Sequence, residues 1–498
     1  MKFNFRILLG PGIIIFYFAT RFINLKIVPI FTDEAIYNYW AQVALHDPAN
    51  RFMSLEDGKQ PLFIWIAAVM QKFIADPLIA SRLVSVFAGF GSLIGIYLLT
   101  KTLFNKKIAT LACLLYIILP FTLLYDRLAL YDSLLTMFGI WAVFFSVKMA
   151  KSPQLDTALL NGFVIGFGLI TKSSANFFLY LLPFSLLLFD YKQKNRPLRF
   201  IKWLLLTLIT AILALVIYNS LRLSPLFYMI DRKNQEFIRP VFEVLGNPTV
   251  QFPGNFRTLI LWLVQYNGWP LLVLAMVTII WAIARRNLSI IFLSIYIIIP
   301  FFVEGIFNKI IYPRFMLFFF PFIIIIIAFA ATHVVSLRKS YYKFLWLILM
   351  ILILIQPIFA SYRLLTNPPR AKIADSDLAQ YFNSWPAGYG VSEIVKIIKG
   401  ESQHQDVVVG TEGTFGLLPF AIQIYFYNSQ NVQIIGYWPV SDIPQQILET
   451  AKTKKTYFVF NEKQNLPDDP KNPRLKLVGK YQKGIGASFM RLYEIIPQ

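Results

Sequence analysis

Two adjacent carboxylates, Asp33 and Glu34, follow directly on the first apolar run of the chain. Charged groups at a membrane boundary are costly unless they are paired or have a function. A carboxylate there could act as a general base that takes the proton of an acceptor hydroxyl, and Asp33 is suited to this role. Adjacent helical residues point about 100° apart, so Glu34 would orient hydroxyl groups instead. Both acids, with Thr32 as cap, would equally suit the first turn of a helix, and the sequence leaves the two roles open.

Four cations near the same predicted face of the membrane suit an anionic leaving group such as a phosphate. They are Lys59, Arg82, Arg127 and Arg314. Arginine holds phosphate bidentately, and stabilising the charge on a leaving group is often the largest catalytic term. Asp132 and Tyr312 are the expected supporting residues. Taken singly, a Lys or Arg at the end of a span has a plain role as a snorkelling residue, so the prediction depends on their convergence.

Nothing in the sequence calls for a metal or a cofactor. The one cysteine, Cys113, lies in an apolar run, so no disulfide within the chain and no cysteine-based metal site is possible. The histidines His46, His333 and His404 are far apart and form no zinc-binding pair. We expect no cofactor to be required, and the sequence gives no support for a divalent metal.

The elements that must position these residues are membrane spans. Of the 498 residues, 57% are hydrophobic and 15% are charged, against about 25% charged residues in a soluble domain. The mean hydropathy is +0.58. The net charge of +21 comes from short clusters of Lys and Arg between apolar runs, a placement typical of topology signals and anionic lipid. We therefore predict an integral membrane protein in contact with membrane lipid, and no nucleic-acid partner.

Apolar runs of about 20 residues predict eleven spans. They cover about 7–24, 80–100, 108–125, 132–149, 157–171, 175–190, 201–220, 258–283, 288–304, 314–335 and 343–361. The first is interpreted as an uncleaved span and not a signal peptide. Basic clusters at about 101–107, 148–151, 192–202, 285–286 and 338–343 predict cytoplasmic loops, a cytoplasmic N-terminus and an extracytoplasmic C-terminus. The run 61–70 is short for a span and predicts an interfacial helix in the first outer loop, 25–79.

The composition changes after residue 361, and Asn367, Pro368 and Pro369 mark a boundary. We expect a transmembrane domain over 1–361, with the active site on loop 25–79, and an extracytoplasmic α/β domain over 362–498. Strand patterns fall at 406–410, 422–427, 432–437, 456–461, 475–481 and 489–495. Helical patterns fall near 390–399 and 444–452. The predicted fold class is a polytopic α-helical membrane protein with a C-terminal extracytoplasmic α/β domain.

These motifs together resemble the GT-C superfamily of polyprenyl-phosphate-sugar glycosyltransferases, and most of all its protein O-mannosyltransferase and aminoarabinose-transferase group. Asp33-Glu34 stands in the first outer loop, as in that group. The stretch Lys59-Gln60-Pro61-Leu62 with Trp65 is similar to the group's Lys-Pro-Pro-Leu…Trp stretch, and Ser81-Arg82-Leu83-Val84-Ser85 is similar to its Arg-Leu-Pro-Ser. Residues 127–135 resemble its Arg-x-x-x-x-Asp turn. Tyr312-Pro313-Arg314-Phe315 resembles the Arg-aromatic element of its late span.

The resemblance covers most of residues 1–335. It implies an inverting transfer of a sugar from a polyprenyl-phosphate carrier to an acceptor hydroxyl outside the cytoplasm, with Asp33 as base and Lys59 and Arg82 on the donor side. Gln60 stands where proline is common, and Gly58 replaces an acid that holds a metal in some members, so no metal is expected. The α/β domain differs from the β-trefoil module of eukaryotic protein mannosyltransferases, which indicates a bacterial kind of enzyme using undecaprenyl phosphate.

Other function classes remain as alternatives. A lipid-carrier flippase or transporter would show inverted repeats and broken spans. A non-catalytic membrane scaffold would explain the soluble tail but not the outer-face charges, and a lipid-linked polymerase or ligase usually lacks an acidic pair so early in the chain. The expected partners are a polyprenyl-phosphate-linked sugar and an acceptor on a protein, a lipid or a glycan, and the sequence names neither the sugar nor the acceptor.

Overall fold

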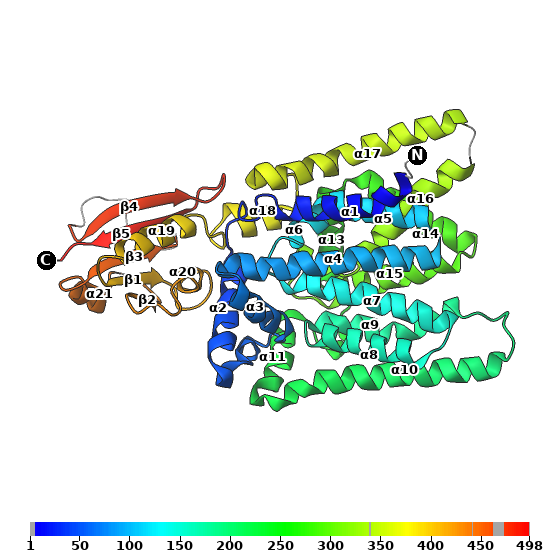
Figure 1. The fold of residues 1–498 in the computed structure, drawn as a ribbon, viewed down its shortest axis with the longest axis horizontal. Helices are drawn as coiled ribbons and strands as arrows, with labels where there is room; N and C mark the ends of the chain where they lie inside the picture. The colour runs from blue at the N-terminus through cyan, green and yellow to red at the C-terminus, as the bar shows by residue number, and fades with distance from the viewer. Residues whose placement is uncertain (1–4, 338–339, 441, 462–472, 498) are drawn as a thin grey trace.

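The computed structural model describes residues 5–337, 340–440, 442–461 and 473–497. Long helices lie side by side in a bundle, and a small sheet with its own helices lies beyond one end of that bundle (Figure 1). The bundle consists of α1 (Phe5–Phe22), α4 (Pro77–Leu103), α5 (Lys106–Ile118), α6 (Pro120–Tyr125), α7 (Tyr131–Lys151), α8 (Leu155–Leu169), α9 (Asn176–Tyr180), α10 (Arg196–Asn219), α13 (Phe252–Asn267), α14 (Trp269–Ala284), α15 (Leu288–Phe307), α16 (Phe320–Leu337) and α17 (Ser340–Thr366).

Each predicted span has a helical counterpart, but the helices differ in length. In the part of the chain that the structure describes, five helices, namely α4, α7, α10, α15 and α17, are long and apolar enough to cross a membrane alone. The pair α13 and α14, bent by 115° at the break between them, makes a sixth if it counts as one span. Segments such as α8 and 173–188 are apolar but shorter. The number eleven therefore stays a prediction.

Small residues allow close helix packing, as at the contact of α8 with α10. A Cβ atom on Gly162 would lie 2.9 Å from the side chain of Leu213, and one on Gly166 would lie 2.6 Å from that of Ile217. The two glycines are one turn apart and form a groove for the larger side chains of α10. Within lipid the hydrophobic effect does not drive helices together, and close van der Waals packing at small residues stabilises their contact instead.

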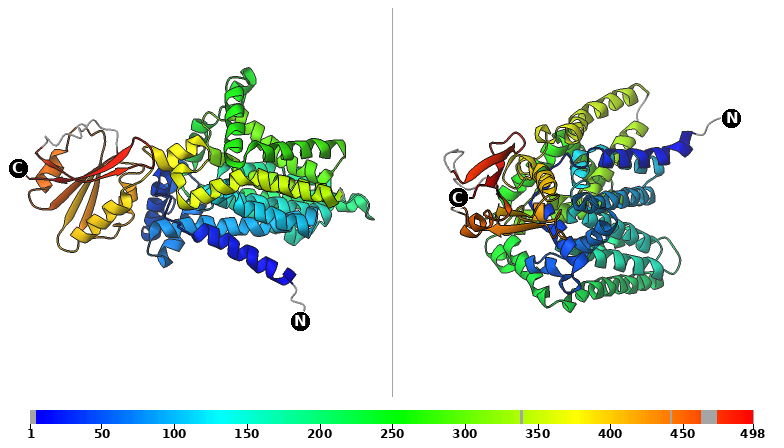
Figure 2. Two further views of the ribbon diagram at one scale, coloured as in Figure 1. Left: turned by 90° about the horizontal axis from the view of Figure 1, so that it is seen from above. Right: turned by 60° about the vertical axis from the view of Figure 1, so that its left-hand side comes forward.

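The predicted cytoplasmic loops gather at the end of the bundle away from the sheet. Lys151 Nζ donates to the Thr102 carbonyl at 2.8 Å, and Arg199 donates to the Lys151 carbonyl at 2.8 Å. The rings of Phe104 and Phe329 lie 4.9 Å apart and join the end of α4 to α16. Residues 338–339 of the last basic cluster lie outside the described residues. Figures 1 and 2 show the N-terminus on the bundle and the C-terminus beyond its opposite end, and the orientation in a membrane stays a prediction.

The segment predicted as the first outer loop lies across the end of the bundle that faces the sheet. It contains α2 (Thr32–His46), the short turns 48–50 and 53–57, and α3 (Leu62–Phe73). The helix predicted over 61–70 is α3, and its Trp65 donates from Nε1 to the Arg51 carbonyl at 2.8 Å. A second segment at the same end of the bundle contains α11 (Met229–Phe237) and α12 (Val241–Gly246). Lys233 pairs with Asp57 at 2.7 Å and so ties the second segment to the first.

The C-terminal part forms a five-stranded mixed sheet in the order β2-β1-β3-β5-β4. Its strands are β1 (Val407–Glu412), β2 (Val432–Tyr437), β3 (Lys455–Phe460), β4 (Leu475–Gln482) and β5 (Phe489–Ile495). The first three run parallel, and β5 is antiparallel to β3 and β4. Alternate residues of β1 face opposite sides: Val407 and Val409 pack in the core with α19 (Val391–Glu401), and Val408 packs in a second cluster with α21 (Gln445–Thr450).

The strand predicted over 422–427 is wrong, because this segment is α20 (Phe420–Gln423) followed by turns. A short apolar run has no period that separates strand from helix. Both sides of β1 are already paired, with β2 and β3. The run instead packs on α2, where the rings of Phe420 and Tyr39 stack at 4.3 Å.

The sheet part is joined to the bundle through α2 and not only through the chain. The Thr32 amide donates to the Pro386 carbonyl at 3.1 Å, and the Gly388 amide donates to the Ile30 carbonyl at 2.7 Å. One buried core includes residues of both parts, such as Phe31 and Val409. The predicted division at residue 361 stays a prediction, and the two parts share an interface on the helix that carries Asp33.

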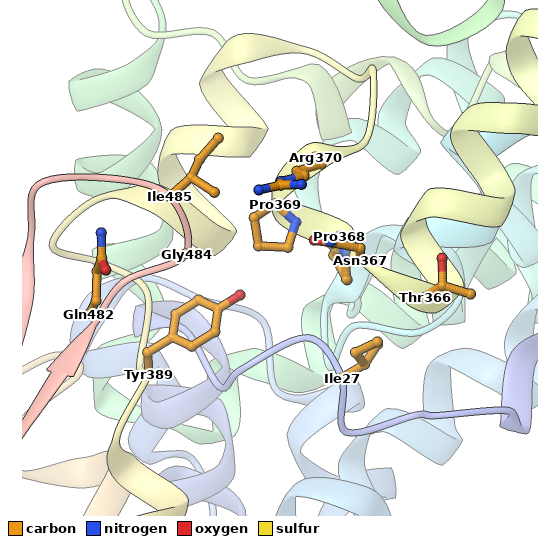
Figure 3. A pocket seen from close by; sticks show the side chains of 10 residues that line it. All are labelled: Ile27, Thr366, Asn367, Pro368, Pro369, Arg370, Tyr389, Gln482, Gly484 and Ile485. Carbon is orange, nitrogen blue, oxygen red and sulfur yellow. The ribbon is translucent and has the colours of Figure 1, made fainter.

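A cavity of about 450 Å³ lies at the same junction, on another side of it (Figure 3). It is lined by residues 366–370 at and after the end of α17, by Ile27 and Tyr389, and by Gln482, Gly484 and Ile485. None of the predicted site residues lines it, so the cavity is separate from the site described next.

Candidate active site

The two adjacent carboxylates have different partners. Arg314 Nη1 donates to Asp33 Oδ2 at 2.7 Å, and the two side chains are 11% and 23% exposed. Arg314 belongs to the short helix Pro313–Met316 between α15 and α16, and its guanidinium packs over the Tyr312 ring at 4.9 Å. Asp33 is therefore accessible and faces a cation, as a base beside an anionic leaving group would.

Glu34 is fully buried and is held by Arg82. Arg82 Nε and Nη2 donate to the two oxygens of Glu34 at 2.8 and 2.6 Å. The remaining guanidinium N–H groups donate to the carbonyls of Leu25, Val28 and Pro29, so that all five are used. Arg82 has no N–H left for a phosphate, and this geometry argues against the donor-side role expected for it.

Arg127 also donates its hydrogen bonds to backbone carbonyl oxygens. Its Nη1 donates to the carbonyls of Thr20 and Ile23 at 2.9 and 2.7 Å, and Nη2 donates to that of Asn24 at 2.8 Å. Thr20 lies in the last turn of α1, and Ile23 and Asn24 follow directly after it, where a helix leaves its last carbonyls without partners. Arg127 thus holds the end of α1 through its two terminal nitrogens, contrary to a phosphate-binding role.

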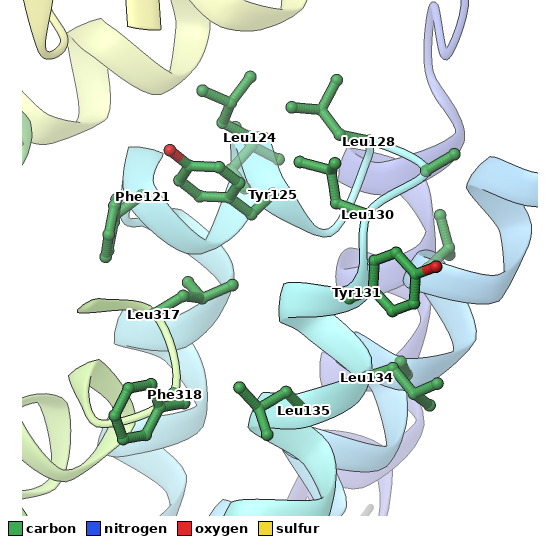
Figure 4. Packing of buried hydrophobic residues seen from close by; sticks show 14 of the residues in the cluster. Phe121, Leu124, Tyr125, Leu128, Leu130, Tyr131, Leu134, Leu135, Leu317 and Phe318 are labelled. Carbon is green, nitrogen blue, oxygen red and sulfur yellow. The ribbon is translucent and has the colours of Figure 1, made fainter. Parts of the chain in front are cut away.

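The turn between α6 and α7 fixes Arg127 and Asp132 through tight packing. Leucine and aromatic side chains of residues 121–135 interlock there with Leu317 and Phe318 (Figure 4). The Ala129 amide of this turn donates to Glu34 Oε1 at 2.7 Å. Arg82, Glu34 and this turn therefore form one buried framework that holds the start of α2.

Asp132 and Lys172 form the second ion pair of the site. Lys172 Nζ lies 2.6 Å from Asp132 Oδ1, and the same ammonium group lies 4.5 Å from the centre of the Phe315 ring. Phe315 follows Arg314, so both pairs meet at the Tyr312–Phe315 element. Nothing in the sequence distinguishes Lys172 from other Lys residues at span ends, because no local pattern marks a partner 40 positions away.

The ammonium group of Lys59 has no hydrogen bond or ion pair with any residue in the described ranges. It lies 5.4 Å from the centre of the Phe237 ring. Burial lowers the pKa of Lys59 from its ordinary value, and the nearby Asp33 and Asp57 offset part of this effect. Lys59 is thus a cation of the site that is free to bind an anion.

The structure therefore brings Asp33, Lys59, Asp132 and Arg314 together and adds Lys172. Tyr312 supports Arg314, and Thr32 does not cap α2: its hydroxyl donates to the Pro386 carbonyl at 3.3 Å. Among the described residues no group of three His, Cys, Asp or Glu side chains could hold a metal ion. The expectation that no metal or cofactor is required stays a prediction.

A buried acid, Asp377, reaches the site from the C-terminal part. It lies on α18 (Asp375–Leu378) and accepts hydrogen bonds at Oδ2 from the hydroxyls of Tyr125, at 2.6 Å, and Tyr266. Burial raises the pKa of Asp377 to about 6, while the two tyrosine hydroxyls act in the opposite direction. No local sequence pattern indicates this residue, whose partners lie more than 100 positions away.

Asp377→Asn is expected to stabilise the protein at neutral pH. Because the folded pKa lies above the ordinary value of 3.8, the folded state binds the proton more tightly, and the free energy of unfolding falls as the pH rises from about 4 to about 6. The neutral amide of the variant avoids this loss in the free energy of unfolding, which is on the order of 2–3 kcal/mol. Thermal unfolding of the full-length protein should show a higher melting temperature for the variant at pH 7.5 and little difference at pH 4.5. A lower melting temperature at both pH values would contradict the prediction.

Comparison with known proteins relates this arrangement to a family and a fold. Residues 58–218 match the family described as dolichyl-phosphate-mannose-protein mannosyltransferase. No curated protein sequence matches the chain. Among solved structures, apo ArnT from Cupriavidus metallidurans is similar, with a TM-score of 0.54 at 12% identity over 99% of this chain and 98% of that one.

Two further structures are similar over most of the chain. The apo oligosaccharyltransferase of Archaeoglobus fulgidus gives a TM-score of 0.55 at 12% identity, over 92% of this chain and 70% of that one. ArnT from Cupriavidus metallidurans bound to undecaprenyl phosphate gives 0.53 at 11% identity, over 99% and 98%. At such identities the likeness concerns the fold. The chain therefore shares the fold of these structures, and its segment 58–218 carries the sequence pattern of the dolichyl-phosphate-mannose-protein mannosyltransferase family.

Proposed function

We propose that this protein is a membrane glycosyltransferase that moves a sugar from a polyprenyl-phosphate carrier to an acceptor hydroxyl on the extracytoplasmic face. The observation that carries the proposal is the pairing of Arg314 with the accessible carboxylate of Asp33, close to the unpaired Lys59 and to the pair of Lys172 with Asp132. Structures of similar fold support a carrier of this kind, since ArnT was solved with undecaprenyl phosphate and the Archaeoglobus fulgidus oligosaccharyltransferase AglB with an inhibitory peptide and a dolichol phosphate.

The transfer needs one base and one site for a phosphate. Asp33 takes the proton of the acceptor hydroxyl, and the acceptor oxygen attacks the anomeric carbon from the face opposite the phosphate. The bond between that carbon and the phosphate oxygen breaks, and its electron pair leaves with the carrier phosphate. Lys59 and Arg314 stabilise this charge. Attack from the opposite face inverts the configuration at the anomeric carbon.

The pairing of Asp33 with Arg314 suggests an order of events. In the structure the Arg314 guanidinium group occupies one oxygen of the Asp33 carboxylate, so that oxygen is not open to an acceptor hydroxyl. The phosphate of an incoming donor competes for the same guanidinium group, which binds phosphate strongly. Donor binding therefore frees Asp33, and we expect the acceptor to lose its proton only when the donor is in place.

Glu34, Arg82 and Arg127 then act as positioning residues. The buried pair of Glu34 and Arg82 holds the first turn of α2, and Arg127 holds the end of α1 just before it. Asp132 holds Lys172 near the leaving group. We also propose that the sheet part is extracytoplasmic, which the basic loops at the opposite end of the bundle support.

A transfer assay tests the proposal. Membranes that contain the full-length protein are incubated with a panel of radiolabelled polyprenyl-phosphate sugars, and the labelled product is separated as protein, lipid or polymer. Label transferred from at least one donor supports the proposal and identifies the class of acceptor. Inactivity with every donor, or movement of the carrier across vesicle membranes without sugar transfer, contradicts it.

Lys59 gives a pH dependence that can be measured on the same enzyme. Because its pKa lies below the ordinary value of lysine, its charge is lost at a lower pH than that of an exposed lysine. Donor affinity should therefore fall as the pH rises while an exposed lysine would still be charged, and this fall should be absent in Lys59→Arg, which stays charged. Lys59→Gln should weaken donor binding by about 10–100-fold at pH 7.5, the loss of a charge-assisted hydrogen bond. An unchanged affinity in Lys59→Gln would exclude Lys59 from the donor site.

A further inference from the structure

Three exposed aromatic side chains lie at the carboxyl ends of neighbouring strands of the sheet. Trp385, Phe415 and Trp438 are 46%, 56% and 57% exposed. Phe415 follows β1 and Trp438 follows β2, while Asn461, which follows β3, donates from Nδ2 to the carbonyl of Trp385 at 3.1 Å. The strands β2, β1 and β3 are adjacent and parallel, so each strand end has one exposed ring beside it. Ligands of open α/β sheets bind at this edge.

The loop of Phe415 lies along the helix that carries Asp33. A Cβ atom on Gly416 would lie 3.5 Å from Cγ2 of Thr32, which precedes Asp33. The ring of Phe415 lies 6.4 Å from that of Trp40. Asp33 and Trp40 are seven positions apart on α2, which places them on the same face of the helix, about 10 Å apart along its axis. The exposed ring of Phe415 therefore lies on the side of α2 that carries the proposed base.

The other two rings belong to segments that contact α2 or this loop. The carbonyl after Trp385 accepts a hydrogen bond from the Thr32 amide at 3.1 Å. The carbonyl before Trp438 accepts one from the Gly413 amide at 2.7 Å, and Gly413 begins the loop of Phe415. The three segments thus form one surface beside the start of α2.

Phe415 is held on one side and exposed on the other. Its ring contacts Trp40 and packs edge-on against Phe420 at 5.5 Å. The loop turns at Gly413 and Gly416, both with a φ of +117°, which residues with a side chain rarely adopt. More than half of the Phe415 side chain stays exposed. A ring that is fixed before binding loses little conformational freedom when a partner binds.

The composition of this surface selects a neutral partner. The segments 384–389, 413–419 and 437–440 contain no Asp, Glu, Lys or Arg. An anionic lipid headgroup or a phosphorylated acceptor would be bound through cations. Because β1 is paired on both sides, an extended peptide cannot add to the sheet beside Phe415. A saccharide fits, since its rings are neutral and their C–H groups pack on the negative face of an aromatic ring.

We propose that Phe415, with Trp385 and Trp438 beside it, binds a neutral saccharide acceptor whose terminal hydroxyl reaches Asp33. The proposal rests on the proposed function and deepens it by naming the class of acceptor. The distance of about 10 Å along α2 is longer than one sugar ring, so the acceptor has at least two units. The last unit presents its hydroxyl to Asp33, and an earlier one stacks on Phe415, which determines specificity and takes no part in proton transfer.

Phe415→Leu tests the stacking contact, because it keeps an apolar side chain and removes the flat ring. The full-length protein in nanodiscs is titrated with neutral tetrasaccharides of glucose, mannose and galactose and with a peptide rich in Ser and Thr, and saturation-transfer NMR measures binding. Wild type should bind at least one tetrasaccharide. Phe415→Leu should weaken that binding by about tenfold, and Phe415→Tyr, which keeps the ring, should bind like wild type. Equal melting temperatures of the three proteins exclude misfolding as the cause.

Phe73→Leu is the matched control, since Phe73 ends α3, is 77% exposed and lies outside the three segments. It should leave saccharide binding unchanged. In transfer to a saccharide that binds, Phe415→Leu should raise the KM for the acceptor and leave kcat unchanged.

Two results would overturn the saccharide site. One is that wild type binds no tetrasaccharide, including the case in which it binds only the peptide. The other is that Phe415→Leu binds tetrasaccharides as tightly as wild type. Failure of the proposed function is a separate result, in which saccharide binding depends on Phe415 but no radiolabelled donor transfers its sugar.

Discussion

Asp33→Asn is expected to slow sugar transfer by about 10²–10⁴-fold, the contribution of a positioned general base. The amide oxygen of the substituted side chain would still accept a hydrogen bond from Arg314, as Asp33 Oδ2 does at 2.7 Å, so α2 keeps its position. An amide cannot take the proton of the acceptor. The loss should therefore appear in kcat, while the affinity for the donor changes little or increases because Arg314 is released from an ion pair. Transfer from the radiolabelled donor, measured at saturating acceptor, gives the rate.

Asp47→Asn is a matched control for this variant. Asp47 is another acid of the first outer segment, and it accepts hydrogen bonds from the Ala49 amide and from Asn50. Asparagine serves as a cap as well as aspartate does, so transfer should stay at the wild-type rate. Wild-type transfer by Asp33→Asn would remove Asp33 from the mechanism.

Glu34→Ala is expected to destabilise the fold by about 3–5 kcal/mol, the usual result of removing one partner of a buried ion pair. It leaves the guanidinium group of Arg82 fully buried with its charge uncompensated, since the three carbonyls at residues 25–29 carry no formal charge. It also leaves the Ala129 amide without its acceptor. The melting temperature of the full-length protein in detergent, and the yield of folded protein, measure the effect.

A double variant separates the structural role of Glu34 from a catalytic one. Replacing a buried pair with apolar residues is often nearly neutral, so Glu34→Met combined with Arg82→Met should recover much of the stability lost in Glu34→Ala. Recovery of both folding and sugar transfer would show that the pair only positions α2. A Glu34→Gln variant that melts like wild type but transfers no sugar would instead restore the hydroxyl-orienting role predicted from the sequence.

The sequence predicts the types of group in this site better than it predicts their partners. Asp33, Lys59 and Arg314 are recognisable because an acidic pair and several cations converge on one predicted face of the membrane. The same reasoning predicts a phosphate-binding role for Arg82, but the use of its guanidinium group depends on whether carbonyl oxygens surround it. Those oxygens belong to the irregular segment 25–29, whose path is set by packing and not by any residue type in it.

Long-range contacts explain the other differences. Lys172 becomes part of the site only because α7 and α8 place it beside Asp132, and Asp377 only because the C-terminal part packs on α6 and α13. Apolar length predicts the helices well, since lipid demands long apolar runs. It does not predict the segment 422–427, because a strand and a helix bury a short apolar run equally well and the neighbours of β1 decide between them.

The interface between α2 and the sheet part has a consequence for biosynthesis. The hydroxyl of Thr32 donates to a carbonyl 354 positions later in the chain, so the base-bearing helix is made long before the segment that it contacts. Contacts of such separation form late, after the intervening chain has closed a long loop. A ribosome that stalls before residue 386 would leave an inserted bundle in which α2 lacks its contact with the sheet part. Sugar transfer would then begin only after the C-terminal part has been made, which keeps unfinished copies from consuming the lipid carrier.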